Sequence, residues 1–174
     1  KDKTTTQKFI SNFVTGLAEI SKHYSLIVSP TETNTTVNEF IWLSKIHNAG
    51  NIANFLPLIV ASRINFYRNL ISEAQYVSIL KSLELYSYRV FLWQGRRSNA
   101  GISNLYRWAS EVFTNKMDIE KLPRYIDGLI NWYSDEISFK DTIKKPINWY
   151  SKRGILIYTL FEYELELLKS EGKG

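Results

Sequence analysis

Hydrophobic residues recur at helical spacing in nearly every segment of this chain, and the strict alternation of a half-buried strand appears over no useful length. Proline, glycine and N-capping side chains mark where the helices begin and end. The expected helices cover residues 6–24, 36–50, 55–69, 72–95, 103 to the turn at 117–118, 119–133, a short stretch from 138, and 151–169. The sequence therefore predicts an all-α fold, a single bundle of about seven or eight helices.

The first and last of these helices carry clear hydrophobic stripes. In the first helix, the residues that share one side are Phe9, Phe13, Leu17, Ile20 and Tyr24. In the last helix, the aligned residues are Leu156, Leu160, Tyr163 and Leu167, and the expected outer face carries Glu162, Glu164 and Glu166. Because such a stripe marks the side of a helix that packs against the core, we expect both stripes to be buried.

Two helix starts have the spacing of a capping box, in which two side chains three residues apart satisfy each other's backbone N–H groups. Thr36 precedes Glu39 by three residues, and Ser72 precedes Gln75 in the same way. The helix over residues 55–69 is the one we expect to be most buried.

Length and composition describe one packed domain. A chain of 174 residues with 44% hydrophobic and 14% aromatic residues is large and apolar enough to bury a core without disulfides or metals. No internal repeat or long linker divides it, so we interpret residues 1–174 as a single helical domain. The chain starts at Lys1 without a methionine and closes on Ser170-Glu-Gly-Lys-Gly174. We therefore expect an internal fragment excised from a larger protein.

Charge and cysteine content narrow the setting. No uncharged stretch is long and apolar enough to span a bilayer, and no secretory signal is present, so we expect no membrane partner. The chain has no cysteine, which excludes disulfides, thiolate metal sites and a cysteine nucleophile and fits a cytoplasmic location. The net charge of +5 is a mild basic bias that favours nucleic-acid contact or simply solubility.

The sequence contains no recognisable catalytic motif. Its two histidines, His23 and His47, lack partners at the spacing of a metal site. Glu19 precedes His23 by four residues, which is typical of a surface pair rather than of a ligand set. Serine-hydrolase, Walker and dinucleotide-binding motifs are absent. We therefore expect that this chain is not an enzyme and holds no metal or cofactor. An enzyme with an unrecognised site is the third interpretation, and it requires a deep pocket with titratable groups.

Basic residues give the one patterned polar signal. Between Tyr88 and Arg107 there are four arginines and no acid, and between Lys140 and Arg153 there are five basic residues and one acid. The candidate contact residues for nucleic acid or for a neighbouring domain are Arg89, Arg96, Arg97, Arg107, Lys144, Lys145, Lys152 and Arg153. Such clusters suit phosphate groups. For most of them a structural interpretation is stronger, because cations complement helix C-termini and arginines stack on aromatic rings.

Four elements follow one another along the chain. They are Phe9–Ala18 followed by Tyr24 and Pro30, Phe55–Ala61 before a Ser-Glu-initiated helix, Tyr88-Arg89-Val90 leading to Asn99 and Gly101, and Tyr150-Ser151 before Ile157–Glu164. In this order they resemble the helical middle region of GmrSD-type (type IV) restriction endonucleases and SspE-like phage-defence proteins. The last element is similar to the leucine-rich, glutamate-bearing helix that precedes the HNH nuclease domain in that family. The resemblance covers nearly the whole chain.

The resemblance implies a parent protein that joins an N-terminal ParB-like nucleotide-handling domain to a C-terminal HNH nuclease and gates cleavage of modified or foreign DNA by nucleotide hydrolysis. Neither family motif occurs here: Asp127-Gly128 continues as Leu129-Ile130, and no histidine follows His47. No catalytic residue is carried over. The resemblance thus implies a non-catalytic helical scaffold that couples the flanking domains, with the stretch from Arg89 to Gly101 contacting one of them or DNA. The alternative is an autonomous helical module that binds nucleic acid or protein, and the oligomeric state stays open.

Overall fold

The computed structural model describes residues 3–146, 148, 150 and 152–172. Within these residues the chain forms eight α-helices and no strand, so the predicted all-α bundle of seven or eight helices is confirmed. The helices are α1 (Lys3–Val28), α2 (Val37–Ala49), α3 (Leu56–Tyr67), α4 (Glu73–Tyr86), α5 (Ile102–Phe113), α6 (Leu122–Tyr133), α7 (Glu136–Lys144) and α8 (Arg153–Ser170).

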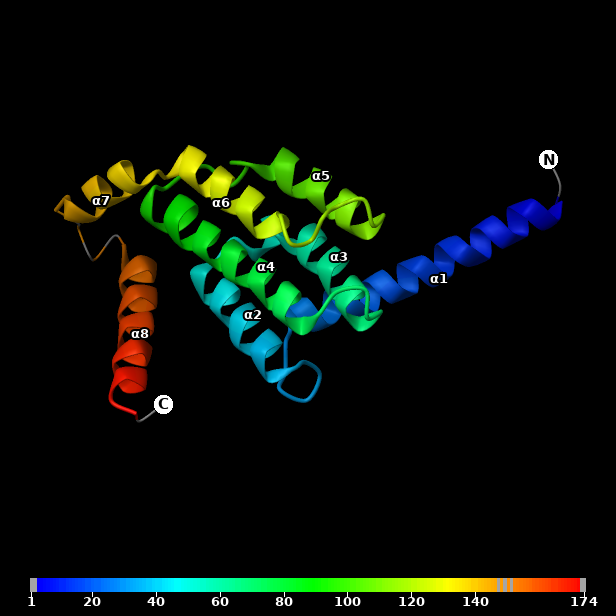
Figure 1. Cartoon of the computed structure of the whole chain (residues 1–174), viewed down its shortest axis with the longest axis horizontal. Helices are drawn as coiled ribbons and strands as arrows, with labels where there is room; N and C mark the ends of the chain where they lie inside the picture. Colours follow the sequence, from blue (N-terminus) through cyan, green and yellow to red (C-terminus); the bar gives the residue numbers. More distant parts are fainter. Residues whose placement is uncertain (1–2, 147, 149, 151, 173–174) are drawn as a thin grey trace.

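The helix α3 lies at the centre of the bundle (Figure 1). It packs against α1, α4 and α5, and α4 packs in turn against α2 and α6. Every residue from Leu58 to Asn65 in α3 is buried, which agrees with its expected place as the most buried helix. Its side chains join one continuous apolar core with residues of the surrounding helices, among them Leu43, Phe55 and Ile79.

The two predicted capping boxes have different outcomes. At the start of α4, Ser72 and Gln75 each satisfy the other's backbone N–H group, so this capping box is confirmed. At the start of α2, the Thr36 hydroxyl accepts a hydrogen bond from the Glu39 N–H group at 3.2 Å. The Glu39 carboxylate does not complete the box, because it turns into the core and pairs with Arg63.

Beyond Tyr86, α4 continues as a π-helical segment, Ser87–Trp93, in which the backbone makes one wider turn. The Gln94 N–H group donates to the Arg89 carbonyl five residues earlier, at 3.1 Å. Gly95 follows with a φ of +59°, in the left-handed region that glycine adopts without strain. The predicted end of this long helix near Gly95 is therefore confirmed, although its last two turns are not α-helical.

Gly101 marks a close approach of three elements at the start of α5. Its φ is +70°, and a Cβ atom at this position would lie 2.5 Å from the Tyr86 hydroxyl and 2.7 Å from a Leu129 methyl group. The Tyr86 hydroxyl itself donates to the Ala100 carbonyl at 3.1 Å. Only glycine fits here without displacing the end of α4 or the side of α6.

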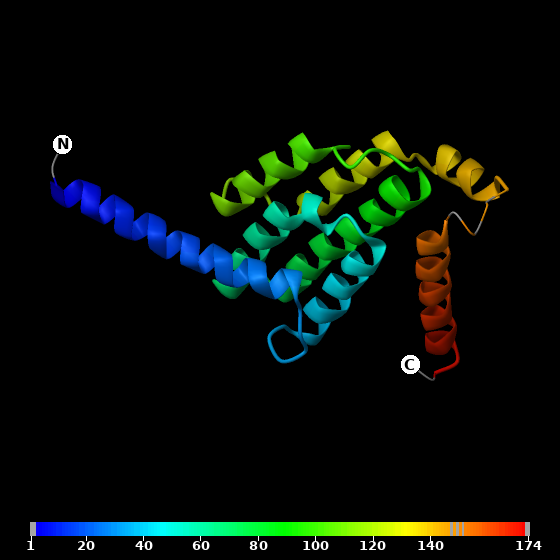
Figure 2. The same cartoon turned by 180° about the vertical axis from the view of Figure 1, so that it is seen from behind.

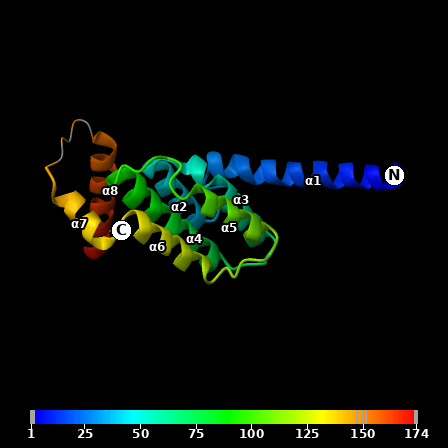
Figure 3. The ribbon, with the colours of Figure 1, turned by 90° about the horizontal axis from the view of Figure 1, so that it is seen from above.

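The terminal helices extend away from the bundle at opposite ends of the molecule (Figures 1, 2 and 3). The N-terminal half of α1 projects beyond the other helices, and α8 lies at the far end against α2 and the π-helical segment. The prediction for α1 is right for the helix and wrong for its stripe, because Phe9 and Phe13 are 70% and 57% exposed. Only the C-terminal half of α1 reaches the core, where Ile27 is fully buried.

The predicted packing side of α8 is also wrong. The buried residues are Ile155 and Tyr158, whereas Leu160 and Tyr163 of the predicted stripe are 55% and 62% exposed. Glu162, expected on the outer face, instead forms an ion pair with Lys45 of α2. A polar pair therefore decides which side of α8 meets the bundle, and the hydrophobic stripe is left on the outside.

Candidate functional site

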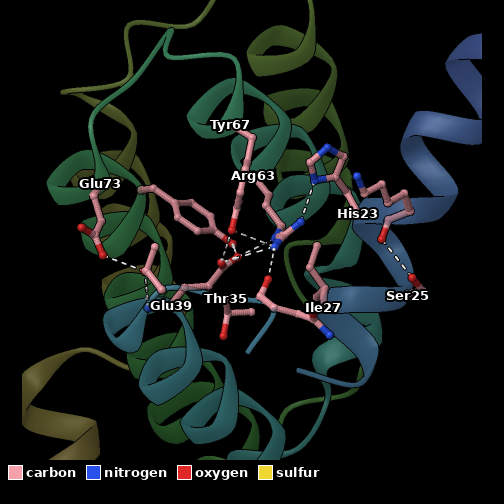
Figure 4. A network of polar contacts seen from close by, with 12 residues as sticks. His23, Ser25, Ile27, Thr35, Glu39, Arg63, Tyr67 and Glu73 are labelled. Atoms are coloured by element: carbon pink, nitrogen blue, oxygen red, sulfur yellow. Dashed lines mark hydrogen bonds and ion pairs between the residues drawn. The ribbon is translucent and has the colours of Figure 1, made fainter. Parts of the chain in front are cut away.

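A buried network of polar side chains joins four helices near the middle of the molecule (Figure 4). Its centre is Arg63 of α3, which is 1% exposed and donates from Nε to the Glu39 carboxylate of α2 at 2.6 Å. The Glu39 side chain is fully buried. A buried carboxylate and guanidinium must be paired to be tolerated, and each supplies the other's counter-charge here.

Two tyrosines complete the surroundings of the Glu39 carboxylate. The Tyr76 hydroxyl of α4 donates to it at 3.0 Å, and the Tyr67 hydroxyl of α3 donates at 3.1 Å. Burial and the neighbouring negative charge raise the pKa of both hydroxyls above the usual tyrosine range. Both tyrosines therefore stay protonated and act as hydrogen-bond donors.

His23 connects α1 to this network. Its Nδ1 atom lies 2.8 Å from an Arg63 guanidinium nitrogen, and the histidine is 8% exposed. Burial first, and the Arg63 charge second, lower the pKa of His23. The imidazole is thus neutral near pH 7, with Nδ1 accepting the hydrogen bond from the guanidinium. Glu19, the expected partner of His23, instead pairs with Arg68, where Nε donates at 3.0 Å.

This network fixes how α1, α2, α3 and α4 meet, and its groups are turned toward one another rather than toward a cavity (Figure 4). Sequence reasoning missed it. The available signal was a single arginine, Arg63, within the otherwise apolar helix α3, because a cation in a buried helix needs a buried partner. The partner Glu39 lies 24 residues away and was assigned to a helix cap.

A second polar cluster holds α8 in place. Lys45 of α2 pairs with Glu162, and the Tyr158 hydroxyl donates to Glu84 of α4. Burial raises the pKa of the Glu84 carboxyl group and that of the Tyr158 hydroxyl. Next to this cluster, a shallow hollow of about 270 Å³ is lined by Asn48, Gly154, Ile157, Tyr158 and Phe161.

The structure brings two of the predicted basic residues to one place, the C-terminal end of α6. Arg89 donates to the Ser134 carbonyl at 2.7 Å, and Arg96 donates to the Tyr133 carbonyl at 3.1 Å. Both supply donors to carbonyls that have no partner within the helix. The Arg89 guanidinium also lies 4.5 Å from the ring centre of Phe139. For these two arginines the structural interpretation is confirmed.

The other predicted basic residues are spread over three regions. Arg97 is exposed in the segment before α5. Arg107 of α5 donates to Asn104 at 3.2 Å and lines a hollow of about 390 Å³ beside the Trp108 and Tyr125 rings. The remaining four are exposed at the end of α7 and the start of α8, and they are Lys144, Lys145, Lys152 and Arg153. The eight candidates therefore do not form one continuous patch.

The largest exposed apolar surfaces with helical regularity lie on the two terminal helices. The α1 face consists of Phe9, Ile10, Phe13, Val14 and Leu17, which are 50% to 70% exposed. The α8 face consists of Ile157, Leu160, Phe161, Tyr163 and Leu167, which are 39% to 62% exposed. Contiguous exposed apolar surface of this kind marks a site of protein contact.

No family model, no curated protein and no solved structure matches this chain. Among the described residues, no group of three or more histidine, aspartate and glutamate side chains gathers where a metal ion could be held. Within the same residues, no helix has both the length and the apolar character to cross a bilayer.

Proposed function

We propose that this chain is a non-catalytic helical scaffold whose terminal helices are docking surfaces for other protein domains. The α1 face and the α8 face carry this proposal, because both expose hydrophobic stripes at helical spacing that the bundle leaves uncovered. The two faces lie at opposite ends of one packed body (Figure 1). A body of this kind holds two partners at a set separation.

The resemblance to the helical middle region of GmrSD-type and SspE-like proteins supplies the setting of the proposal. In such a protein the scaffold would couple a ParB-like nucleotide-handling domain to an HNH nuclease. The α8 helix corresponds to the element that precedes the nuclease in that family, and α1 would meet the domain on the other side. The proposed partners are therefore the flanking domains of a DNA-targeting restriction protein.

The nuclease and nucleotide-hydrolysis activities of the purified chain test the non-catalytic part. We expect no cleavage of modified or unmodified duplex DNA, and no release of phosphate from ATP or GTP, above the level of a heat-unfolded control. Activity that co-purifies with the folded chain would contradict the proposal. Translating the gene on both sides of the chain tests the setting, with a ParB-like domain before it and an HNH domain after it as the expected result.

A second candidate function, nucleic-acid binding, is favoured by the basic residues around the α7–α8 connection. Lys144, Lys145, Lys152 and Arg153 are exposed, and in the described part of the chain none of them forms an ion pair. Filter binding of duplex and single-stranded DNA at two salt concentrations tests this candidate. Weak retention that falls steeply with salt and is lost on changing these four residues to alanine supports it, whereas no retention at low salt removes it.

A further inference from the structure

The α1 face and the α8 face match each other in length and chemistry. From Phe9 to Leu17 the α1 face spans on the order of 12 Å, and from Ile157 to Leu167 the α8 face spans about 15 Å. Each presents two aromatic rings among aliphatic side chains. Two helical faces of similar length and apolar character can pack together along their axes.

The charges on the two helices are complementary. Between Lys3 and Ala18, α1 contains two lysines and no acid. The end of α8 contains Glu164 and Glu166, both exposed, with Lys169 as the one basic residue of its last turn. Opposite charges at the edges of an apolar contact favour this pairing over the contact of a helix with its own copy, where like charges would face one another.

A hydrophobic groove continues the α1 face toward the bundle. Ile20, three residues beyond Leu17, borders a hollow of about 230 Å³. Its other lining residues come from α3 and α5 and are Pro57, Val60, Ala61, Ala109 and Phe113. A helix that lies along the projecting part of α1 would reach this groove with one end.

We propose that two copies of this chain associate through two equivalent contacts, in each of which the α1 face of one copy packs on the α8 face of the other. Because α1 and α8 lie at opposite ends of the body (Figures 1 and 3), an antiparallel arrangement of two copies brings each α1 beside the other copy's α8. The two contacts are then related by a two-fold axis and close the assembly as a dimer. This inference rests on the proposed function, since it names a second copy as the protein that docks on the terminal helices.

The exposed area suffices for a stable dimer. A large aromatic or aliphatic side chain offers roughly 200 Å². The five residues of the α1 face, at 50% to 70% exposure, thus offer on the order of 500 Å², and the α8 face offers slightly less. Each copy contributes both faces, so the total of about 900 Å² per copy exceeds the roughly 800 Å² per partner of a standard interface.

Sedimentation velocity of the whole chain over about a hundredfold range of concentration tests this inference. We expect a monomer–dimer equilibrium with no larger species. The variant Phe9→Ser/Phe13→Ser removes the rings of the α1 face, and Leu160→Ser/Tyr163→Ser does the same for the α8 face. Each variant should weaken self-association by at least about a hundredfold, because every substitution occurs twice in the dimer. The matched control is Trp132→Ser, since Trp132 of α6 is 82% exposed and lies on neither face.

Mixing the two double variants identifies which faces meet. A mixed dimer keeps one intact contact, between the α8 face of the first variant and the α1 face of the second, whereas either variant alone keeps none. We therefore expect the mixture, followed through a fluorescent label on one variant, to associate more tightly than either variant by itself and less tightly than the unchanged chain.

Several results would overturn the inference. A chain that stays monomeric, an open series of larger assemblies, or a mixture that associates no better than its components would each do so. Loss of association in the α1 variant but not in the α8 variant would instead place two α1 faces against each other. All variants are checked by far-ultraviolet circular dichroism, since the substituted side chains are exposed and the fold is expected to survive. A monomeric chain leaves the scaffold proposal intact, whereas nuclease activity removes the scaffold proposal without affecting the dimer.

Discussion

Replacing Arg63 by methionine tests whether the buried network holds the bundle together. Methionine is nearly as long as arginine and apolar, so it fills much of the same space without a charge. The Glu39 carboxylate, fully buried, then loses its counter-charge and keeps only the hydroxyl donors of Tyr67 and Tyr76. His23 also loses the donor to its Nδ1 atom. The change therefore leaves an uncompensated negative charge in the core.

The expected loss is large for a single substitution. Removing one partner of a buried ion pair costs about 3–5 kcal/mol of the free energy of unfolding. For a chain of this length about 1 kcal/mol corresponds to roughly 2–4 °C, so the melting temperature should fall by about 6–20 °C. The matched control is Arg68→Met, on the turn that follows α3. Arg68 pairs with Glu19 at the surface, with side-chain exposures of 44% and 34%, and should cost less than about 1 kcal/mol.

Urea unfolding followed by circular dichroism measures both variants together with Glu39→Gln and the double variant Arg63→Met/Glu39→Gln. Neutralising Glu39 removes the uncompensated charge, so the double variant should be more stable than Arg63→Met alone by about 1 kcal/mol or more. The explanation is refuted if Arg63→Met costs no more than Arg68→Met. It is also refuted if adding Glu39→Gln lowers stability further, since the carboxylate would then not be the group left without a partner.

Three further outcomes are expected. Because burial and the neighbouring guanidinium lower the pKa of His23 in the folded chain, its contribution to stability is present above the unfolded value of about 6.5 and is lost as the pH falls through the lowered value; urea midpoints should therefore drop more steeply below pH ~6.5 than those of His23→Gln. Gly101→Ala should cost about 2 kcal/mol or more, since it combines a φ of +70° with a Cβ atom 2.5 Å from the Tyr86 hydroxyl, and a thermal melt unchanged within error would contradict this. Arg96→Ala/Arg97→Ala should leave the chain folded with a loss below about 1.5 kcal/mol, because both side chains are exposed and one donates a single hydrogen bond to a helix end; a collapse of the melting transition would contradict their placement.

Local chemistry made the helices predictable from the sequence. Hydrophobic spacing sets helical periodicity, and single residues set helix ends, so Thr36, Gly50, Ser72 and Gly95 each end or begin a helix where predicted. The helix predicted over residues 119–133 begins later, at Leu122, because residues 118–121 form a turn. A turn and the first turn of a helix have similar sequence preferences, so this boundary was less well determined.

The faces of the terminal helices and the buried network were not predictable in the same way. Periodicity shows that a helix has an apolar side, but it does not show what covers that side, as the exposed Phe13 and Tyr163 demonstrate. The pairing of Arg63 with Glu39 depends on how α2 and α3 pack, and no local pattern connects residues 24 apart. The same holds for Arg96, whose role follows from where α6 ends in space.

The π-helical segment Ser87–Trp93 makes this region sensitive to chain length. Its wider turn accommodates more residues than an α-helix over the same rise. Loss of one residue there would let an ordinary helix run through and would rotate everything after it by about 100° around the axis. Arg96 would then point away from the Tyr133 carbonyl. Among natural variants of this chain, substitutions in this stretch should thus be common where single-residue gaps are rare.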